Sequence, residues 1–445
     1  MNARRHTVVF GLGITGDSCV RFLHPTDRLT VVDTRANPPF ADATRRRCPD
    51  VELLLGTATA EQVADADRIV VSPGIATSHC LLRVARERGV PLVSDIELFL
   101  EHAGAPVIGI TGTNGKSTAT ALTGELMRAA RRNVGVGGNL GEAALDLLSD
   151  DRDAYVVELS SFQLERLNAG RVAIAANLNV TPDHFDRYPD IAAYAAAKQR
   201  IFVGADVGVF NRADPLTRPN ERTVGRLVSV GLDAPSRDGW GIVERSGRRY
   251  LANELREIIE ADALGIRGRH NEFNALVSLA LVAAAGVDPA SCVETLRTFA
   301  GLDHRCQTVA VVAGVTYIND SKATNVGACL AALEGLGDAE RKHIVLIAGG
   351  DAKNADLSSL RDPVSKYVRA VVTLGKDAGD VEAAVAGAVV TQRVDSLHGA
   401  VRHARSIARA GDLVLLSPAC ASLDMFKNFE DRGRQFAAAV LEMAP

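Results

Sequence analysis

A glycine-containing loop at residues 111–118 reads Thr-Gly-Thr-Asn-Gly-Lys-Ser-Thr and lies between an apolar run and a stretch rich in Ala, Leu and Glu. A strand, a glycine loop and a helix in this order wrap phosphates, because backbone N–H groups converge and the helix N-terminus favours negative charge. The sequence therefore predicts an ATP site in which Lys116 reaches the β- and γ-phosphates and Ser117 or Thr118 contacts Mg²⁺. The predicted loop residues are Gly112, Thr113, Asn114, Gly115, Lys116, Ser117 and Thr118.

This loop departs from the usual phosphate-loop pattern at one position. The usual pattern has a glycine five residues before Gly115, where this chain has Ile110, and glycines stand instead at 109 and 112. We therefore expect a shortened relative of the common phosphate loop.

Two further residues are candidates for metal binding. Glu158 follows an apolar run at 154–157, a position from which a carboxylate can reach the Mg²⁺ beside a phosphate loop. His184 lies where a second predicted strand leads into a loop, and a histidine there is a reasonable ligand. Lys198, by contrast, reads by itself as an ordinary exposed lysine of a helix.

The N-terminal segment carries a second nucleotide motif. Residues 11–16 read Gly-Leu-Gly-Ile-Thr-Gly between a strand and a helix, and Asp33 ends the next predicted strand. This pattern fits the dinucleotide-binding fingerprint and, taken alone, favours an NAD-dependent oxidoreductase. A UDP-linked substrate also offers a diphosphate and a ribose, so it accounts for the motif at least as well in a chain with a separate ATP loop.

The elements that position these motifs alternate between short aliphatic runs and longer helical patterns. This alternation predicts an α/β chain with parallel sheets and helical crossovers. Breaks in the alternation divide the chain into three expected domains, at 1–94, 95–301 and 302–445. We expect strands in the third domain at the runs 315–318, 344–347, 370–374 and 413–416, and a small strand in the second at 240–243.

Composition limits the class of protein. The 445 residues are 47% hydrophobic and 23% charged with a net charge of −4, which predicts a soluble globular protein without a basic field for nucleic acid. The seven cysteines are scattered and form no CxxC pair, so we expect neither disulfides nor a zinc site, and a cytoplasmic location. The most apolar helical stretch, at 275–285, is far short of the roughly 20 residues of a membrane span.

Several separate blocks of the sequence resemble the Mur ligases of peptidoglycan synthesis. They are residues 112–117, 158–165, 179–188, 268–275, 304–305 and 319–325, together with the run Ser-Pro-Ala-Cys-Ala-Ser-Leu-Asp-Met-Phe-Lys-Asn-Phe-Glu-Asp-Arg-Gly at 417–433. The last run is most similar to the members that add D-glutamate, and the Asp-Asn-Pro-Arg motif of the diamino-acid-adding members is absent. The chain departs from the pattern at Pro182 and Ala352, neither of which is an expected ligand.

The resemblance implies three domains: a Rossmann-like N-terminal domain for a UDP substrate, a central P-loop ATPase domain with a mostly parallel sheet, and a Rossmann-like C-terminal domain for an amino acid. It implies catalytic roles for Lys116, Glu158, His184 and Lys198, with Ser117 and Glu158 at one Mg²⁺ and His184 and carbamylated Lys198 at a second. It places Asn271, Asn274, Arg305 and Asp320 at ATP. The implied UDP-substrate residues are Ile14, Thr15, Asp33, Thr34, Arg35, Ser72, Gly74 and Asn139. The implied D-glutamate residues are Lys322, Thr324, Lys353, Ser422 and Phe429.

The implied activity is ATP-dependent formation of an amide bond between UDP-N-acetylmuramoyl-L-alanine and D-glutamate through an acyl phosphate, by a monomer. Four alternatives stand beside it. An L-glutamate-adding variant differs only in pocket shape, and a folylpolyglutamate-synthase-like ligase would lack the N-terminal glycine motif. A nicotinamide-dependent oxidoreductase would bind a nicotinamide cofactor, and a non-catalytic nucleotide-binding scaffold would release no phosphate.

Overall fold

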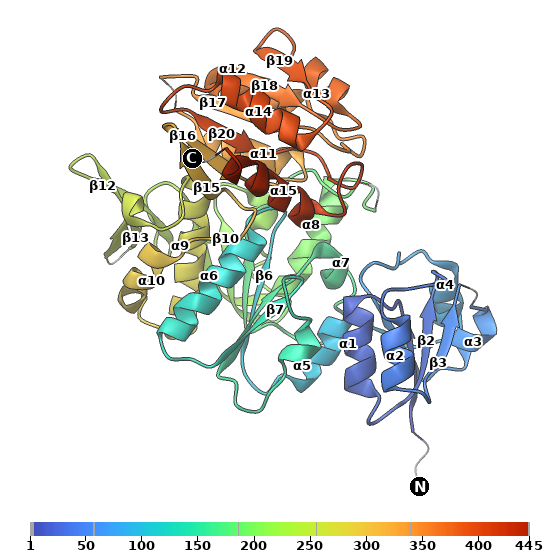
Figure 1. The fold of residues 1–445 in the computed structure, drawn as a ribbon. Coiled ribbons are helices and arrows are strands. Elements are labelled where there is room, and N and C mark those ends of the chain that lie inside the picture. Colours follow the sequence, from blue (N-terminus) through green and yellow to red (C-terminus); the bar gives the residue numbers. More distant parts are fainter. Residues whose placement is uncertain (1–3, 57, 186, 255, 339, 444–445) are drawn as a thin grey trace.

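The computed structural model of the chain describes residues 4–56, 58–185, 187–254, 256–338 and 340–443. Three sheets follow one another along the sequence, and helices pack on each (Figure 1). The N-terminal sheet lies beside the central one, and the C-terminal sheet lies on the other side of the central α6 and α9 region (Figure 1). Each sheet is mainly parallel, so loops at the carboxyl ends of its strands gather along one edge.

The N-terminal sheet has five parallel strands in the order β3-β2-β1-β4-β5. Its strands are β1 (His6–Phe10), β2 (Arg28–Asp33), β3 (Glu52–Leu55), β4 (Arg68–Val71) and β5 (Leu92–Val93). The helices of this part are α1 (Ile14–Leu23), α2 (Ala41–Arg47), α3 (Ala60–Ala64), α4 (Cys80–Glu87) and α5 (Asp95–His102). The reversal of strand order beside β1 places the glycine turn before α1 at the point where such sheets bind ligands.

The central sheet has nine strands in the order β14-β13-β12-β11-β10-β9-β6-β8-β7, antiparallel only from β12 to β14. Its strands are β6 (Val107–Thr111), β7 (Val134–Gly138), β8 (Ala154–Glu158), β9 (Ile174–Asn177), β10 (Ala205–Asn211), β11 (Val224–Val230), β12 (Trp240–Arg245), β13 (Arg248–Asn253) and β14 (Glu257–Glu260). The α-helices are α6 (Lys116–Ala129), α7 (Ser161–Leu164), α8 (Ile191–Gln199), α9 (Arg269–Ala284) and α10 (Val293–Thr298). The 3-10 helices are η1 (Ala144–Leu147), η2 (Arg200–Phe202), η3 (Pro215–Thr217), η4 (Ala261–Ala263) and η5 (Pro289–Cys292).

The C-terminal sheet has six strands in the order β15-β16-β20-β17-β18-β19, of which only β15 runs antiparallel to its neighbour. Its strands are β15 (Gln307–Val312), β16 (Val315–Asn319), β17 (Ile344–Ala348), β18 (Val368–Thr373), β19 (Val390–Arg393) and β20 (Leu413–Leu416). The helices are α11 (Val326–Leu336), η6 (Ser358–Leu360), α12 (Arg361–Tyr367), α13 (Ala378–Ala384), α14 (Leu397–Ile407) and α15 (Phe429–Leu441).

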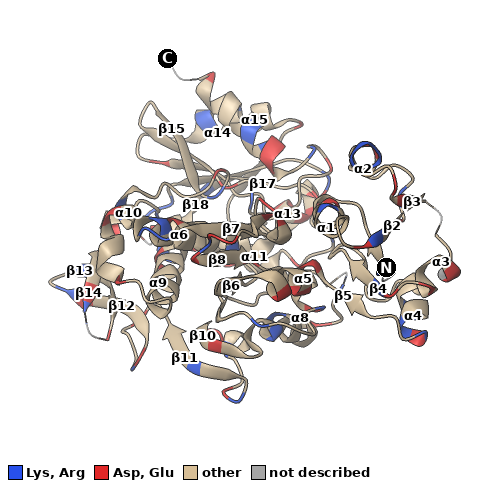
Figure 2. Cartoon of the chain, turned by 90° about the horizontal axis from the view of Figure 1, so that it is seen from below, with Lys and Arg blue, Asp and Glu red and all other residues tan. Residues whose placement is uncertain are grey.

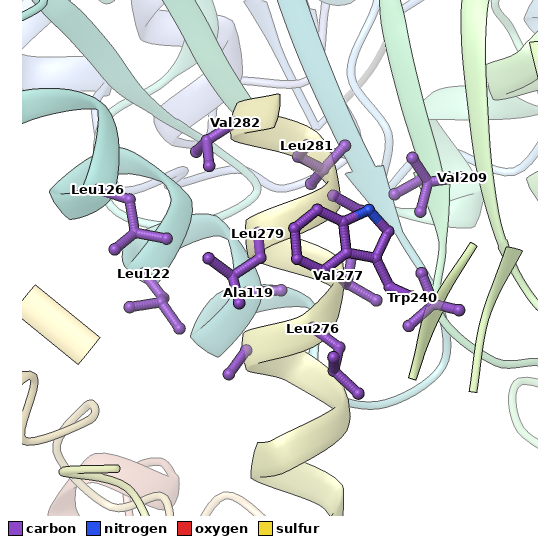
Figure 3. Packing of buried hydrophobic residues seen from close by; sticks show 14 of the residues in the cluster. Ala119, Leu122, Leu126, Val209, Trp240, Leu276, Val277, Leu279, Leu281 and Val282 are labelled. Carbon is purple, nitrogen blue, oxygen red and sulfur yellow. The ribbon is translucent and has the colours of Figure 1, made fainter. Parts of the chain in front are cut away.

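Helix α9 lies inside the central core. Residues 271–282 of this helix are all buried, and Figure 3 shows its leucines and valines between Leu122 and Leu126 of α6 on one side and Trp240 on the other. A helix that is buried on every face cannot shift without opening the core. The polar N-terminal turn of α9 is therefore held in a fixed place.

Charged residues are distributed over all three parts of the chain, with Lys and Arg interspersed among Asp and Glu (Figure 2). Some of these charges join the parts. Arg21 of α1 forms a two-pronged ion pair with Asp146 of η1, with N–O distances of 2.6 and 2.7 Å. In the described part of the chain, no helix has both the length and the apolar character of a membrane span.

The predicted fold class is confirmed: the chain is α/β with three mainly parallel sheets. The expected strand at 240–243 is present as β12, and the four runs expected in the third part are strands β16, β17, β18 and β20. Strands β15 and β19 were not predicted. Both lie at sheet edges and are only partly buried, so they lack the continuous apolar run that marks a central strand.

Candidate active site

The phosphate loop connects β6 to α6 with two glycines in conformations that other residues adopt at a cost. Gly115 has φ +84° directly before the helix, and Gly112 has φ +153°. Lys116 Nζ donates to the carbonyl oxygens of Gly112 and Thr113 at 2.8 Å each. Burial lowers the pKa of Lys116, and the nearby Glu158 opposes that shift. The lysine thus lies folded over the loop, where it can meet a phosphate.

Asn179 holds the phosphate loop from the neighbouring strand. Its Oδ1 accepts from the backbone N–H of Asn114 at 2.8 Å, and its Nδ2 donates to the Asn114 carbonyl at 3.0 Å. The Asn179 carbonyl also accepts from the backbone N–H of Thr113 at 2.8 Å. Three hydrogen bonds from one residue therefore fix the loop between its glycines.

Gly109, which stands at the departure from the usual pattern, and Gly115 of the loop itself are required for different physical reasons. A Cβ at Gly109 would lie 2.8 Å from a Val172 methyl group, so this glycine serves packing on the sheet. A Cβ at Gly115 would lie 2.5 Å from Asn274 Oδ1, so the N-terminal turn of α9 touches the loop itself. Asn274 Nδ2 in turn donates to Asn271 Oδ1 at 3.1 Å. Asn274, predicted to lie at ATP, is thus adjacent to the phosphate loop, and its hydrogen bond joins it to Asn271, another residue predicted there.

Glu158 lies at the end of β8, and β8 pairs with β6 so that Glu158 is opposite Ile110 at the start of the loop. Its side chain is 2% exposed. Oε1 accepts from Asn139 Nδ2 at 2.7 Å, whereas Oε2 is buried and has no hydrogen-bond partner within the described residues. A buried carboxylate oxygen without a partner is costly unless a cation or donor completes it.

Lys198 is buried, and the expectation that it is an ordinary exposed lysine is wrong: its residue is only 1% exposed. Its Nζ donates to the Gly112 carbonyl at 2.8 Å and lies 4.6 Å from the centre of the Tyr194 ring. Burial, followed by the charge of Lys116, holds its pKa well below the usual range. The His184 ring lies against the same tyrosine, with centroids 6.1 Å apart, so the structure brings the two predicted ligands together.

The C-terminal part contributes two cations to this site. Arg305 Nη2 donates to Ser117 Oγ at 2.6 Å, which links the third sheet to the phosphate loop. Burial lowers the pKa of Arg305, and Glu158 opposes the shift. Burial, and then the charge of Arg305, lowers the pKa of Lys322 to about 8. The negative charge of Glu158 thus opposes the lowering of the pKa of Lys116, Lys198, Arg305 and Lys322.

Asp320 lies beside them. Burial raises its pKa to about 6, against hydrogen bonds from Ser417 Oγ at 2.8 Å and the Cys306 N–H at 3.1 Å. The segment after it is also joined to the central part, since Asn325 Nδ2 donates to Asp183 Oδ2 at 3.0 Å.

The predicted D-glutamate residues fall into two nearby groups. Lys322 Nζ lies 3.8 Å from the centre of the Phe429 ring, and the Thr324 N–H donates to the Lys322 carbonyl at 2.8 Å. Lys353 and Ser422 lie on two loops that are paired between residues 351 and 421. The Lys353 N–H donates to Asp351 Oδ1 at 2.9 Å.

The predicted UDP-substrate residues surround the glycine turn before α1. Asp33 accepts from the Leu12 N–H at 2.7 Å and pairs with Arg35 through both carboxylate oxygens. Burial alone would raise the pKa of Asp33, but these hydrogen bonds outweigh that effect and the pKa is lowered. Ser72 Oγ donates to the Gly11 carbonyl at 2.9 Å. Four further members are partly or fully exposed: Ile14, Thr15, Thr34 and Gly74. Asn139 lies apart from this turn and contacts Glu158.

The residues present fit a magnesium ion that is completed by substrate phosphates. The described residues contain no cluster of three or more His, Cys, Asp or Glu that would form a closed metal site. Mg²⁺ beside nucleotides, however, uses only one or two carboxylates together with hydroxyl and phosphate oxygens. The unpartnered Oε2 of Glu158 and the hydroxyl of Ser117 supply such ligands.

Several contacts of the site were not predicted from sequence. Asn179, Tyr194 and Asn325 were given no role, although Asn179 and Asn325 stand inside the quoted motifs. Asn179 follows the end of β9 by two residues and Asn325 is the N-cap of α11. A polar residue in the loop after a strand is the signal that could have drawn attention to these two. Asp186, within the same motif as Asn179, lies outside the described residues.

Family models match most of the chain. Residues 5–94 match the Mur ligase MurD-like N-terminal domain, residues 110–282 the Mur ligase middle domain, and residues 304–420 the Mur ligase glutamate ligase domain.

Individual relatives match over nearly the full length. A UDP-N-acetylmuramoylalanine–D-glutamate ligase of Pseudomonas fluorescens is 50% identical, covering 98% of each chain, and that of Pseudomonas aeruginosa is also 50% identical over 98% of each chain. A solved pseudomurein peptide ligase type C from Methanothermus fervidus has the same fold, with a TM-score of 0.62, 17% identity, and coverage of 99% of this chain and 100% of that one. With this fold and this phosphate site, the chain belongs to the Mur ligase family.

Proposed function

We propose that this chain is an ATP-dependent ligase that adds D-glutamate to UDP-N-acetylmuramoyl-L-alanine, a step of peptidoglycan precursor synthesis in the cytoplasm. The similarity to ligases named for this reaction supports the substrates. The observation that carries the chemistry is Glu158, which presents an unpartnered carboxylate oxygen beside the phosphate loop. The comparisons give no support to the L-glutamate-adding or oxidoreductase alternatives.

The chemistry requires an activated carboxyl group, since a free carboxylate is a poor acyl donor. Transfer of the γ-phosphoryl group of ATP to the alanine carboxylate forms an acyl phosphate, and the amine of D-glutamate then displaces phosphate to form the amide. Magnesium, when bound, would neutralise charge on the transferring group. Ser117 and Glu158 are proposed to hold one ion, and His184 with carbamylated Lys198 a second.

The chain's own side chains perform the rest. Lys116 and the loop N–H groups bind phosphate oxygens, and Arg305 reaches the same place from the C-terminal part. Lys322 is proposed to attract a carboxylate of the incoming amino acid, and its ammonium group lies 3.8 Å from the centre of the ring of Phe429, another proposed D-glutamate residue. The contacts of Arg305 with Ser117 and of Asn325 with Asp183 join the central and C-terminal parts, and this closure would help to exclude water that hydrolyses the acyl phosphate.

We retain as proposals the domain boundaries 1–94, 95–301 and 302–445, a monomeric state, and the roles of the individual site residues. Each of the three domains would bind one substrate. The domains must therefore hold a defined arrangement for the reacting groups to meet.

Phosphate release tests the proposal directly. The purified chain is given ATP, Mg²⁺ and UDP-N-acetylmuramoyl-L-alanine, with D-glutamate and L-glutamate offered separately. We expect release only with D-glutamate, and a loss of about 100-fold or more in Glu158→Gln, because the site loses the carboxylate proposed to hold the Mg²⁺ that neutralises the transferring phosphate. Glu142→Gln, which alters an exposed carboxylate after β7, is the matched control. Failure of both amino acids to stimulate release would refute the function, and equal stimulation would refute the stereochemical preference.

A further inference from the structure

Arg166 reaches from the central part into a loop of the N-terminal part. It follows α7, which Figure 1 places on the side of the central sheet that faces the N-terminal sheet. Its Nη1 donates to the Ser72 carbonyl at 2.7 Å, with the Val71 carbonyl at 3.5 Å, and its Nη2 donates to the Ile75 carbonyl. The side chain is 9% exposed. One buried guanidinium therefore holds three carbonyls of residues 71–75, which we call the 71–75 loop.

Arg187 reaches the same loop from the segment that carries His184. Its Nη1 donates to the Pro73 carbonyl at 3.1 Å and its Nη2 to the Ile75 carbonyl at 3.3 Å. Arg187 also pairs with Glu165, and its guanidinium lies 4.2 Å from the centre of the Phe162 ring. Two arginines thus converge on one carbonyl oxygen, that of Ile75.

The 71–75 loop is in turn fixed to the glycine turn before α1. Ser72 Oγ donates to the Gly11 carbonyl, and the Ile75 N–H donates to the Ser72 carbonyl at 3.1 Å. A Cβ at Gly11 would lie 2.9 Å from Ser72, so the two segments are in close contact. Any displacement of the loop would therefore displace the proposed handle for the UDP group.

On the other side, Arg166 is only eight residues after Glu158. Between them, α7 is held by a capping box in which Ser160 and Gln163 exchange hydrogen bonds. This short, capped connection leaves little freedom between the carboxylate at the phosphate loop and the guanidinium at the 71–75 loop.

Little negative charge compensates for the burial of the Arg166 guanidinium group. Glu165 is 3.8 Å away and already pairs closely with Arg187. Burial, and then the charge of Arg187, lowers the pKa of Arg166 to about 10. A second buried guanidinium beside the first is an expensive way to join two domains, since apolar contacts would do this at lower cost. Its forked geometry, however, fixes several carbonyls at once.

We propose that Arg166 is a positioning residue for the acceptor substrate: it sets the distance between the UDP-binding turn and the phosphate loop. The inference rests on the proposed function, in which the UDP group is bound at one end of this span and the reacting carboxylate at the other. The proposal assigns Arg166 to acceptor binding and leaves ATP binding independent of it.

Arg21 provides a matched control. It also joins the N-terminal and central parts, through its two-pronged pair with Asp146, and its other ion pair is with Asp17 of its own helix. Arg166→Gln and Arg21→Gln each remove one guanidinium group that joins the N-terminal part to the central part. A purely structural role would give the two variants the same kinetic profile.

The experiment compares KM for UDP-N-acetylmuramoyl-L-alanine, KM for ATP and melting temperature in the wild type, Arg166→Gln, Arg166→Lys and Arg21→Gln. We expect Arg166→Gln to raise the acceptor KM at least 10-fold with the ATP KM within twofold, Arg166→Lys to lie between it and the wild type, and Arg21→Gln to change neither KM by more than twofold. An unchanged acceptor KM in Arg166→Gln, or equal rises for acceptor and ATP, would overturn the proposal. If Arg166→Gln does not fold, the same criteria apply to Arg166→Lys with a threefold rise.

The activity of the wild type distinguishes a failure of this inference from a failure of the proposed function. A wild-type chain inactive with these substrates refutes the function and the positioning role with it. An active wild type whose Arg166 variants keep the wild-type acceptor KM refutes the positioning role alone.

Discussion

Replacement of Gly115 by Ala tests how tightly the phosphate loop is specified. Gly115 has φ +84°, and an alanine in the left-handed region costs about 1–2 kcal/mol. The added Cβ would lie 2.5 Å from Asn274 Oδ1, so the Asn274 side chain must turn away. That movement breaks its hydrogen bond to Asn271, at a further cost of about 0.5–1.5 kcal/mol.

The summed cost of about 1.5–3.5 kcal/mol appears in ATP affinity. The free loop relieves the strain by leaving its native conformation, and ATP must restore that conformation when it binds. At about 1.4 kcal/mol for each factor of ten, we expect the Kd for ATP to rise about 10- to 300-fold. Isothermal titration calorimetry with ATP and Mg²⁺ measures this change directly.

Gly286→Ala is the matched control for this substitution. Gly286 lies just after α9 in the same part of the chain, has φ +80°, and has no atom within 4 Å of an added Cβ. It should lower the melting temperature through backbone strain and leave the Kd for ATP within twofold. ATP affinity in Gly115→Ala within twofold of the wild type would refute the proposed contact between this loop and α9.

Three further predictions concern neighbouring residues. Asn179→Ala removes two side-chain hydrogen bonds to Asn114, at about 1 kcal/mol each, so the KM for ATP should rise roughly 10- to 30-fold; an unchanged KM would show that the loop holds its shape unaided. Lys198→Ala should nearly abolish turnover and be partly rescued by short carboxylic acids, whereas full activity without them would exclude the carbamate role. Because the pKa of Lys322 is lowered to about 8, first by burial and then by Arg305, its positive charge is lost as pH rises through 8, and the KM for D-glutamate should rise there. In Lys322→Arg this rise should be absent once titration of the amino acid itself is subtracted, and identical pH profiles would contradict the assignment.

Sequence alone determined the features that depend on local chemistry. The phosphate loop, the N-terminal glycine turn and the central strands follow from residue order, because glycine placement and continuous apolar runs act over a few neighbouring positions. Glu158 was predicted for the same reason: it directly follows an apolar strand and enters the row of carboxyl ends where ligands bind. The family resemblance supplied the roles that residue types could not, above all for Lys198.

Only the tertiary structure decided which of these residues share one environment. Lys198 lies on a helix whose sequence gives no sign of burial, yet its ammonium group contacts the Gly112 carbonyl because α8 packs under the phosphate loop. Arg305 of the C-terminal part reaches Ser117 of the phosphate loop, and the charges of Arg305 and Glu158 act on the pKa of Lys322. Arg166 of the central part reaches the 71–75 loop. Desolvation and the charge of distant residues set the pKa values of such groups, and neither quantity can be read from positions along the chain.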